Sequence, residues 1–82
     1  MSHFNKQIPT KKGLLNFYFN RIYTVAGMKY HVSVRHGNSP HYFMMGDGKE
    51  HWHFSDPKIL PEWIIELESF VEEAINEHLK DG

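Results

Sequence analysis

The sequence predicts an α+β fold, in which an antiparallel sheet of four strands is covered on one face by a single C-terminal helix. Two patterns lead to this class. Residues 14–54 alternate apolar and polar side chains with period two, and Gly-containing turn signals divide them into short segments, as in a β-meander. Residues 61–80 place apolar side chains three and four positions apart, which is the spacing of an amphipathic helix. The helix is therefore expected to close the core of the sheet.

The length and composition indicate one small domain. The chain has 82 residues, of which 40% are hydrophobic and 15% aromatic, and it contains no Cys, which excludes disulfides and thiolate metal sites. Residues 1–13 are polar and rich in Lys, so we expect a flexible tail followed by a single α+β domain at 14–82. No apolar stretch is long enough for a membrane span or a signal peptide, and we expect a cytoplasmic protein that has no membrane partner.

Four segments rich in aromatic and β-branched residues are expected to form the strands: about residues 14–25, 28–36, 41–45 and 50–54. Turns are expected between them at Ala26-Gly27, Gly37–Pro40 and Asp47-Gly48. The last of these turns pairs Phe43 with Trp52, and the loop before it pairs Val34 with Phe43. An alternative is that the first strand is broken or bulged near Asn20-Arg21.

The three turns agree on which side chains share a face of the sheet. The inner, apolar face is expected to hold Phe19, Tyr23, Tyr30, Val32, Val34, Phe43, Met45, Trp52 and Phe54. The outer face is expected to hold Tyr18, Asn20, Ile22, His31, Ser33, Arg35, Tyr42, Met44, His51 and His53. The Gly37–Pro40 loop is the weakest part of this register, because a slip of one residue there exchanges the two faces of the third strand.

Two prolines position the start of the helix. Pro57–Leu60 is expected to form a short turn, and the main helix then begins with Pro61 at its first position, where an N–H group is not needed. The apolar stripe of this helix holds Trp63, Ile64, Leu67, Phe70, Val71, Ala74, Ile75 and His78. The opposite, solvent-facing stripe holds Glu62, Glu66, Glu73, Asn76, Glu77 and Lys80.

The net charge of −1 conceals a strong asymmetry between the two halves of the chain. Residues 1–49 contain seven Lys or Arg and one acid, whereas residues 50–82 contain two bases and nine acids. The simplest interpretation is that a basic sheet and an acidic helix complement each other within the molecule; the alternative is that one half faces an anionic partner. Arg21 falls on the apolar face, and we expect it to lay its stem along the core rim and meet a Glu of the helix.

The sheet face without the helix is the candidate binding surface. Its candidate residues are Tyr18, His31, Arg35, Tyr42, Met44, His51 and His53. This mixture of aromatic and apolar groups suits a protein partner or a second copy of the chain. Alternatively, the same face, together with the basic N-terminal tail, binds nucleic acid by stacking bases on the tyrosines. A pI of 6.6 and a single permanent positive charge among these residues favour the protein partner.

The histidines offer weaker signals for metal binding and catalysis. His51 and His53 alternate on a strand and project the same way, which can chelate a transition metal, but no third ligand is expected near them. His31 and Ser33 also share a face, but no acid is expected to orient the imidazole and no oxyanion hole is evident. We therefore assign no metal, cofactor or catalytic residue, and we expect a non-enzymatic interaction module.

Overall fold

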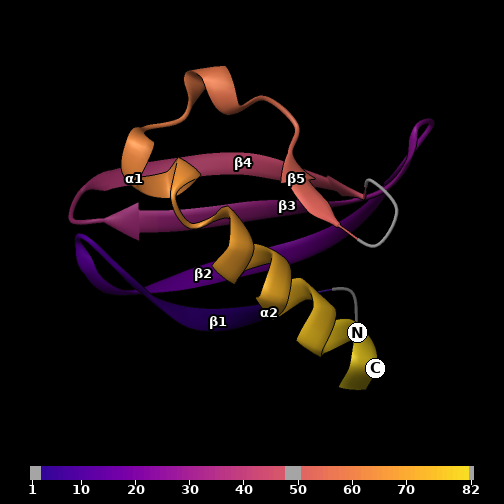
Figure 1. The fold of residues 1–82 in the computed structure, drawn as a ribbon, viewed down its shortest axis with the longest axis horizontal. Helices are drawn as coiled ribbons and strands as arrows, with labels where there is room; N and C mark the ends of the chain where they lie inside the picture. The colour runs from indigo at the N-terminus through magenta and orange to yellow at the C-terminus, as the bar shows by residue number, and fades with distance from the viewer. Residues whose placement is uncertain (1–2, 48–50, 82) are drawn as a thin grey trace.

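A computed structural model describes residues 3–47 and 51–81 of the chain. It contains one antiparallel sheet with the strand order β1-β2-β3-β4-β5, and the C-terminal helices pack on one face of that sheet (Figure 1). In chain order the elements are β1 (His3–Thr10), β2 (Gly13–Thr24), β3 (Gly27–His36), β4 (Ser39–Asp47), β5 (Trp52–Phe54), η1 (Pro57–Ile59), α1 (Glu62–Ile65) and α2 (Glu68–Asp81). The α+β class with an antiparallel sheet and a C-terminal helix is confirmed, but the sheet has five strands and not four.

The additional strand, β1, lies in the segment that the sequence predicts to be a flexible tail. It pairs with β2 along its whole length, from His3 opposite Asn20 to Thr10 opposite Gly13. Its isoleucine, Ile8, is only 3% exposed, and its aromatic ring, Phe4, stacks on a ring of β2. Two apolar anchors spaced four residues apart therefore hold an otherwise polar strand on the sheet.

Two of the hairpin turns use the same four-residue pattern, Thr-x-x-Gly. In each, the Thr hydroxyl donates a hydrogen bond of 2.8 Å to the Gly carbonyl and accepts one from the N–H of the residue before the Gly. The two threonines are Thr10 and Thr24. The glycines, Gly13 and Gly27, have φ angles of 107° and 120°, which L side chains rarely adopt. β2 runs unbroken between these turns, so the alternative of a break near Asn20-Arg21 is wrong.

The strand register differs from the prediction by an even number of residues, so the faces are preserved although the pairs are not. Phe43 lies opposite Val32 and not Val34, because Gly37-Asn38 forms a tight turn closed by the strand ends. Trp52 lies opposite Asp47 and not Phe43. The two-residue turn predicted at Asp47-Gly48 is therefore wrong, and Gly48 itself lies outside the described residues. A register error of two or four residues leaves every side chain on its own side of a pleated strand.

The core lies between the inner face of the sheet and the helices. Its buried residues are Ile8, Phe17, Phe19, Tyr30, Val32, Val34, Phe43, Met45, Trp52, Phe54, Ile64, Leu67, Val71, Ala74 and Ile75. Phe70 of α2, which is predicted for the apolar stripe of the helix, is 50% exposed, and one predicted member of the inner sheet face is also wrong: Tyr23 is 76% exposed. Figure 1 shows the reason, since the purple tip of the β2–β3 hairpin projects past the rest of the molecule.

The predicted helix at 61–80 is divided into α1 and α2 by a turn at Glu66-Leu67. The short turn before it is confirmed as η1, and Pro61 is the N-cap of α1 and not its first residue. Trp63 of α1 contacts His36 and His41 edge-on, with ring centroids 6.2 and 5.5 Å apart. The change of direction leaves α1 beside the β3–β4 turn, while α2 contacts β1 and β5. Neither Pro nor Gly marks this turn in the sequence.

The predicted partner of Arg21 differs in the structure. Among the described residues no carboxylate forms an ion pair with Arg21. Its side chain lies instead beside Tyr30, the residue opposite it on β3, and the Tyr30 hydroxyl and the Arg21 Nε are both buried without a hydrogen-bond partner. Burial raises the pKa of Tyr30, and the neighbouring Arg21 guanidinium opposes this shift more weakly.

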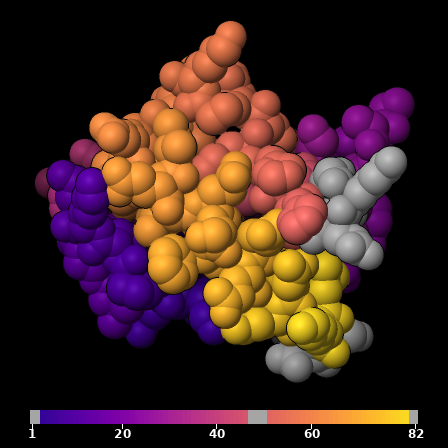
Figure 2. Space-filling view, viewed as in Figure 1, coloured from indigo at the N-terminus to yellow at the C-terminus, as the bar shows by residue number. Residues whose placement is uncertain are grey.

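Ion pairs join the basic N-terminal half to the acidic helices. Lys6 of β1 lies 3.0 Å from Glu77 of α2, and Lys11 in the β1–β2 turn lies 2.9 Å from Glu66. The hydrogen bond to Glu66 raises the pKa of Lys11. In Figure 2 the indigo N-terminal segment and the orange and yellow helices share one side of the surface. These contacts support charge complementarity within the molecule. None of the helices in the described part of the chain is long and apolar enough to cross a membrane.

Candidate functional site

The helix-free face of the sheet carries two exposed tyrosines in one cross-strand row. Tyr18 of β2 lies opposite Ser33 of β3, which in turn lies opposite Tyr42 of β4. The tyrosines are 54% and 58% exposed. Ser33, on the strand between them, has a small side chain, so the surface is lower there than at the two rings. A second row, Asn20–His31–Met44, runs beside the first. We name the tyrosine face by its members: Tyr18, His31, Ser33, Arg35, Tyr42 and Met44.

Side-chain contacts give this surface a defined shape. The His31 ring stacks on the Tyr42 ring, with centroids 6.0 Å apart and planes 11° from parallel. Such diagonal cross-strand contacts restrict rotamers and hold side chains upright on the sheet. The tyrosine face therefore presents partly ordered aromatic rings.

Two hollows border Tyr42. The first, of about 160 Å³, is lined by Tyr18, Ser33, Val34, Arg35, Pro40 and Tyr42. The second, of about 280 Å³, lies between β4 and the segment around η1, and its lining includes His31, Tyr42, Met44, Ile59 and Leu60. The second hollow is mainly apolar, whereas the first carries the Arg35 guanidinium at its side. Tyr42 thus lies between an apolar hollow and a hollow that Arg35 borders.

The tyrosine face lies on a sheet surface without carboxylates. Side chains alternate along each strand, so the face of Tyr18 also carries Lys29 and His3. Among the outer-facing side chains of β1–β4 that the structure describes, none is Asp or Glu. The helices on the other side of the sheet carry the acidic residues instead. The tyrosine face is therefore neutral to weakly cationic.

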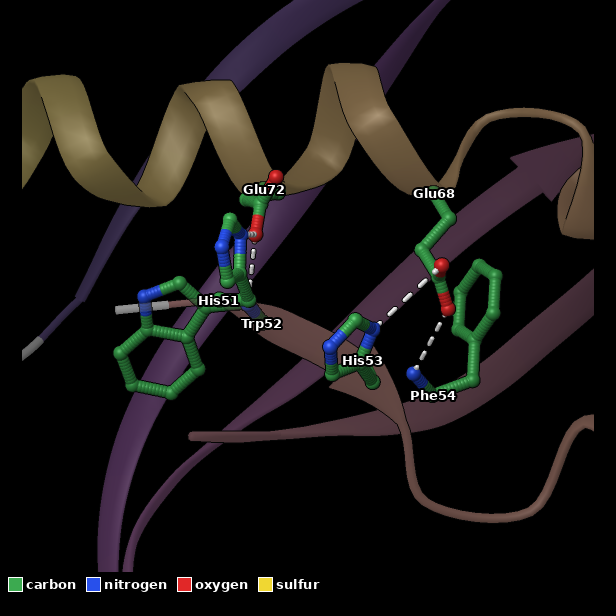
Figure 3. A network of polar contacts seen from close by, with 6 residues as sticks. All are labelled: His51, Trp52, His53, Phe54, Glu68 and Glu72. Atoms are coloured by element: carbon green, nitrogen blue, oxygen red, sulfur yellow. Dashed lines mark hydrogen bonds and ion pairs between the residues drawn. The ribbon is translucent and has the colours of Figure 1, made fainter. Parts of the chain in front are cut away.

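Two of the predicted site residues do not extend this face. The ring Nδ1 of His51 lies 3.2 Å from Glu72, and that of His53 lies 3.5 Å from Glu68, both on α2 (Figure 3). The sequence predicts both histidines to lie on the outer face, and the register keeps His53 on that side, opposite Gly46. Their rings contact helix carboxylates at the β5 edge and lie apart from the tyrosine face, so their part in binding stays a prediction. Of the seven predicted residues, the structure brings together Tyr18, His31, Arg35, Tyr42 and Met44.

The sequence pattern did not predict the role of two helix carboxylates, those of Glu68 and Glu72. Glu72 accepts a hydrogen bond of 2.7 Å from the backbone N–H of Trp52, and Glu68 accepts one of 3.2 Å from that of Phe54 (Figure 3). These N–H groups point away from β4 and have no neighbouring strand. Four residues of helix rise about 6 Å and two residues of strand about 6.8 Å, so an i, i+4 pair of acids matches alternate N–H groups. The sequence signal for this role is a pair of acids four residues apart, next to the apolar stripe of the helix.

The histidine contacts do not create a metal centre among the described residues. The His51 and His53 ring centroids lie 6.1 Å apart, and each Nδ1 contacts a carboxylate. Within 3–47 and 51–81, however, no three His, Asp or Glu side chains are grouped in a way that would hold an ion. His31 contacts Tyr42 and, in the same part of the chain, has no carboxylate to orient it.

Comparisons with protein-family models, with curated proteins and with solved structures each found no match to this chain. Its function is therefore argued from its own residues and their geometry.

Proposed function

We propose that this chain is a non-enzymatic interaction module that binds a protein partner on the tyrosine face. The observation that carries the proposal is the row Tyr18–Ser33–Tyr42, in which two half-exposed aromatic rings stand on the sheet face opposite the helices. Tyrosine is enriched in protein interfaces because it buries a large area at low entropic cost and keeps a hydrogen-bonding group. A row of exposed tyrosine rings is therefore better suited to binding a protein partner than to keeping the surface soluble.

The two hollows beside Tyr42 indicate the chemistry of the partner. An apolar side chain fits the hollow between Met44 and Leu60, while a carboxylate fits beside Arg35. None of the described outward side chains of β1–β4 is acidic, and the hollow beside Arg35 has no acid in its lining, whereas Asp56 lines the other, apolar hollow. We therefore propose a partner segment that presents an apolar residue next to an acidic one.

The test compares three versions of the immobilised full-length chain in the same cell extract, with bound proteins quantified by mass spectrometry. The versions are the wild type, Tyr42→Asp and Tyr23→Asp. Tyr23 is a matched control, because it is an exposed tyrosine at the β2–β3 hairpin tip and lies off the tyrosine face. We expect partners bound by the wild type to be retained by Tyr23→Asp and reduced at least about tenfold by Tyr42→Asp, the loss typical of a central interface residue.

Equal retention by all three versions would contradict the use of this face. Thermal unfolding of each variant checks that the fold is intact, and we expect little change because both tyrosines are exposed. If the bound protein is the chain itself, light scattering will show self-association that Tyr42→Asp abolishes.

A second candidate is single-stranded nucleic acid on the same face. Exposed rings at Tyr18 and Tyr42, with Arg35 beside them, support it, since bases stack on such rings and phosphates pair with such cations. The N-terminal lysines weigh against it, because Lys6 and Lys11 are paired with helix glutamates. The protein partner is therefore favoured.

Fluorescence anisotropy with a labelled single-stranded oligonucleotide separates the two candidates. The nucleic-acid hypothesis requires binding at low salt that weakens steeply with added salt and with Arg35→Ala. No binding at low salt would eliminate it and would leave the protein partner as the remaining proposal.

A further inference from the structure

The two edges of the sheet differ in whether helix side chains bind their outward backbone groups. At the β5 edge, Glu72 and Glu68 accept the outward N–H groups of Trp52 and Phe54. The opposite edge is β1, which is eight residues long and, within residues 3–47 and 51–81, pairs only with β2. Figure 1 shows β1 at the margin of the sheet, with no element beyond it. One edge is thus satisfied by side chains of the helix, and the other is open.

The hydrogen-bonding direction of each β1 residue follows from the turn that joins it to β2. Thr10 and Gly13 close a two-residue turn, and such a closing pair is hydrogen-bonded across the hairpin. Alternation then directs the backbone of Asn5 and Gln7 away from β2. Pro9 falls in the same outward set, where its missing N–H breaks no bond within the sheet. No hydrogen bond outside the ladder uses the backbone of Asn5 or Gln7 within the described chain.

The open edge is held rigidly in the extended conformation. Phe4 stacks on Phe19 at 4.5 Å between ring centroids and on His78 of α2 at 4.0 Å. Ile8 is buried, and Lys6 is paired with Glu77. A strand that is already ordered loses little further entropy when another strand pairs with it.

An apolar side chain stands beside this edge on the helix side. Phe70 is 50% exposed, although the helical pattern predicts it in the core. It borders a groove of about 200 Å³ whose lining also includes Gln7, Ile8, Pro9 and Ala74. A strand added to β1 would therefore cover Phe70.

We propose that β1 pairs in antiparallel fashion with β1 of a second copy of this chain, which joins two sheets into one. The proposed occupant is a second copy because each copy brings its own extended, open β1 strand, whereas its β5 edge is already bound by Glu72 and Glu68. Only a symmetric contact of β1 with itself remains, and it closes a dimer without generating fibres. β1 has no acid, so the two strands themselves meet without like-charge repulsion. Of the two acids of α2 that line the groove beside the edge, Glu77 is paired with Lys6 and Glu73 is exposed.

The dimer has a consequence for the tyrosine face. Asn5 lies opposite Tyr18, so pairing β1 with itself extends the row Tyr18–Ser33–Tyr42 of one copy toward the same row of the other. Two partner sites then lie on one continuous surface. The inference itself does not depend on the proposed function, because the tyrosine face stays uncovered in the dimer.

The test is sedimentation velocity over a concentration series on the full chain and on two variants of one position. Gln7→Pro removes the outward N–H without removing a bond of the β1–β2 ladder, and Gln7→Ala is the matched control that keeps the N–H. In a symmetric dimer each subunit contributes its own residue 7, so Gln7→Pro removes two hydrogen bonds between the subunits. We expect a wild-type dimer that Gln7→Ala retains and that Gln7→Pro weakens by at least about tenfold.

Amide hydrogen exchange provides a second readout that does not depend on a variant. In the dimer, we expect the amides of Asn5 and Gln7 to become protected as protein concentration rises. A wild type that stays monomeric at millimolar concentration would overturn the proposal. So would a dimer that survives Gln7→Pro but is lost in Tyr42→Asp, which would assign self-association to the tyrosine face.

Discussion

Glu72 shows how one side chain can occupy the outward hydrogen-bonding groups of a sheet edge. A single oxygen, Oε2, accepts the Trp52 N–H at 2.7 Å and lies 3.2 Å from the His51 ring. Its neighbour one turn earlier, Glu68, divides the same task between two oxygens, with Oε2 on the Phe54 N–H and Oε1 near His53. An exposed edge is a template for further strand pairing, and these contacts remove it.

We expect Glu72→Ala to lower the free energy of unfolding by about 1 to 2 kcal/mol, because it leaves a partly buried N–H without its charged acceptor. Glu73→Ala is the control, since Glu73 is exposed and adjacent in sequence, and it should change the value by less than about 0.5 kcal/mol. Urea denaturation measures both. Equal effects of the two variants would show that the carboxylate contact contributes nothing to stability.

Tyr30 gives a prediction about pH. Its pKa is raised by burial, so above the pKa of an exposed tyrosine the unfolded chain releases this proton while the folded chain retains it. Stability from this group is complete below about pH 10 and falls as the pH rises further. We expect Tyr30→Phe to reduce the loss of unfolding free energy between about pH 8 and about pH 11, measured by urea denaturation.

At neutral pH the same variant should change the free energy of unfolding by less than about 1 kcal/mol, because the buried Tyr30 hydroxyl makes no close hydrogen bond and interacts only weakly with the neighbouring Arg21. Tyr23→Phe, at an exposed site, serves as the control and should keep the wild-type pH dependence. An unchanged alkaline loss in Tyr30→Phe would mean that this hydroxyl is not the group responsible.

At the scale of elements, β1 is the clearest case of a strand defined by tertiary contacts. Its residues on the helix-free side are polar apart from Pro9, which is tolerated because an edge strand does not need that N–H within its own sheet. Its place on the sheet depends on Ile8 and Phe4, and on a turn with the same Thr-x-x-Gly pattern as the next hairpin. The repeated pattern was present in the sequence, and it is a signal that would have identified the first hairpin.

We expect Ile8→Ala to lower the free energy of unfolding by about 2 to 4 kcal/mol, since it removes a buried side chain and leaves a cavity. Ile59→Ala makes the same chemical change at a position that is 76% exposed, and it should cost less than about 0.5 kcal/mol. Thermal or urea unfolding distinguishes them. If the two variants were equally stable, residues 3–10 would contribute no core contact, as expected of a tail.

At the scale of the whole molecule, the charges are divided between the two faces. Most of the acidic residues lie on α1, α2 and the turn between them, and the described outer face of β1–β4 carries none. Two ion pairs, Lys6–Glu77 and Lys11–Glu66, join the N-terminal half to the helices. Both pairs are exposed, so they orient the helix more than they stabilise it. The separation of charge leaves the described sheet face without acids, which is what the proposed acidic partner segment requires.

The sequence by itself determined the α+β class and the side of the sheet on which most side chains lie, because alternation in strands and helical spacing are local properties of the chain. It therefore identified Tyr18, His31, Arg35, Tyr42 and Met44 as members of one face. The tertiary structure alone decided that residues 3–10 join the sheet, that the helix turns at Glu66-Leu67, and that His51 and His53 contact helix carboxylates. Each of these depends on groups distant in sequence, and their meeting is set by the packing of the helix against the sheet.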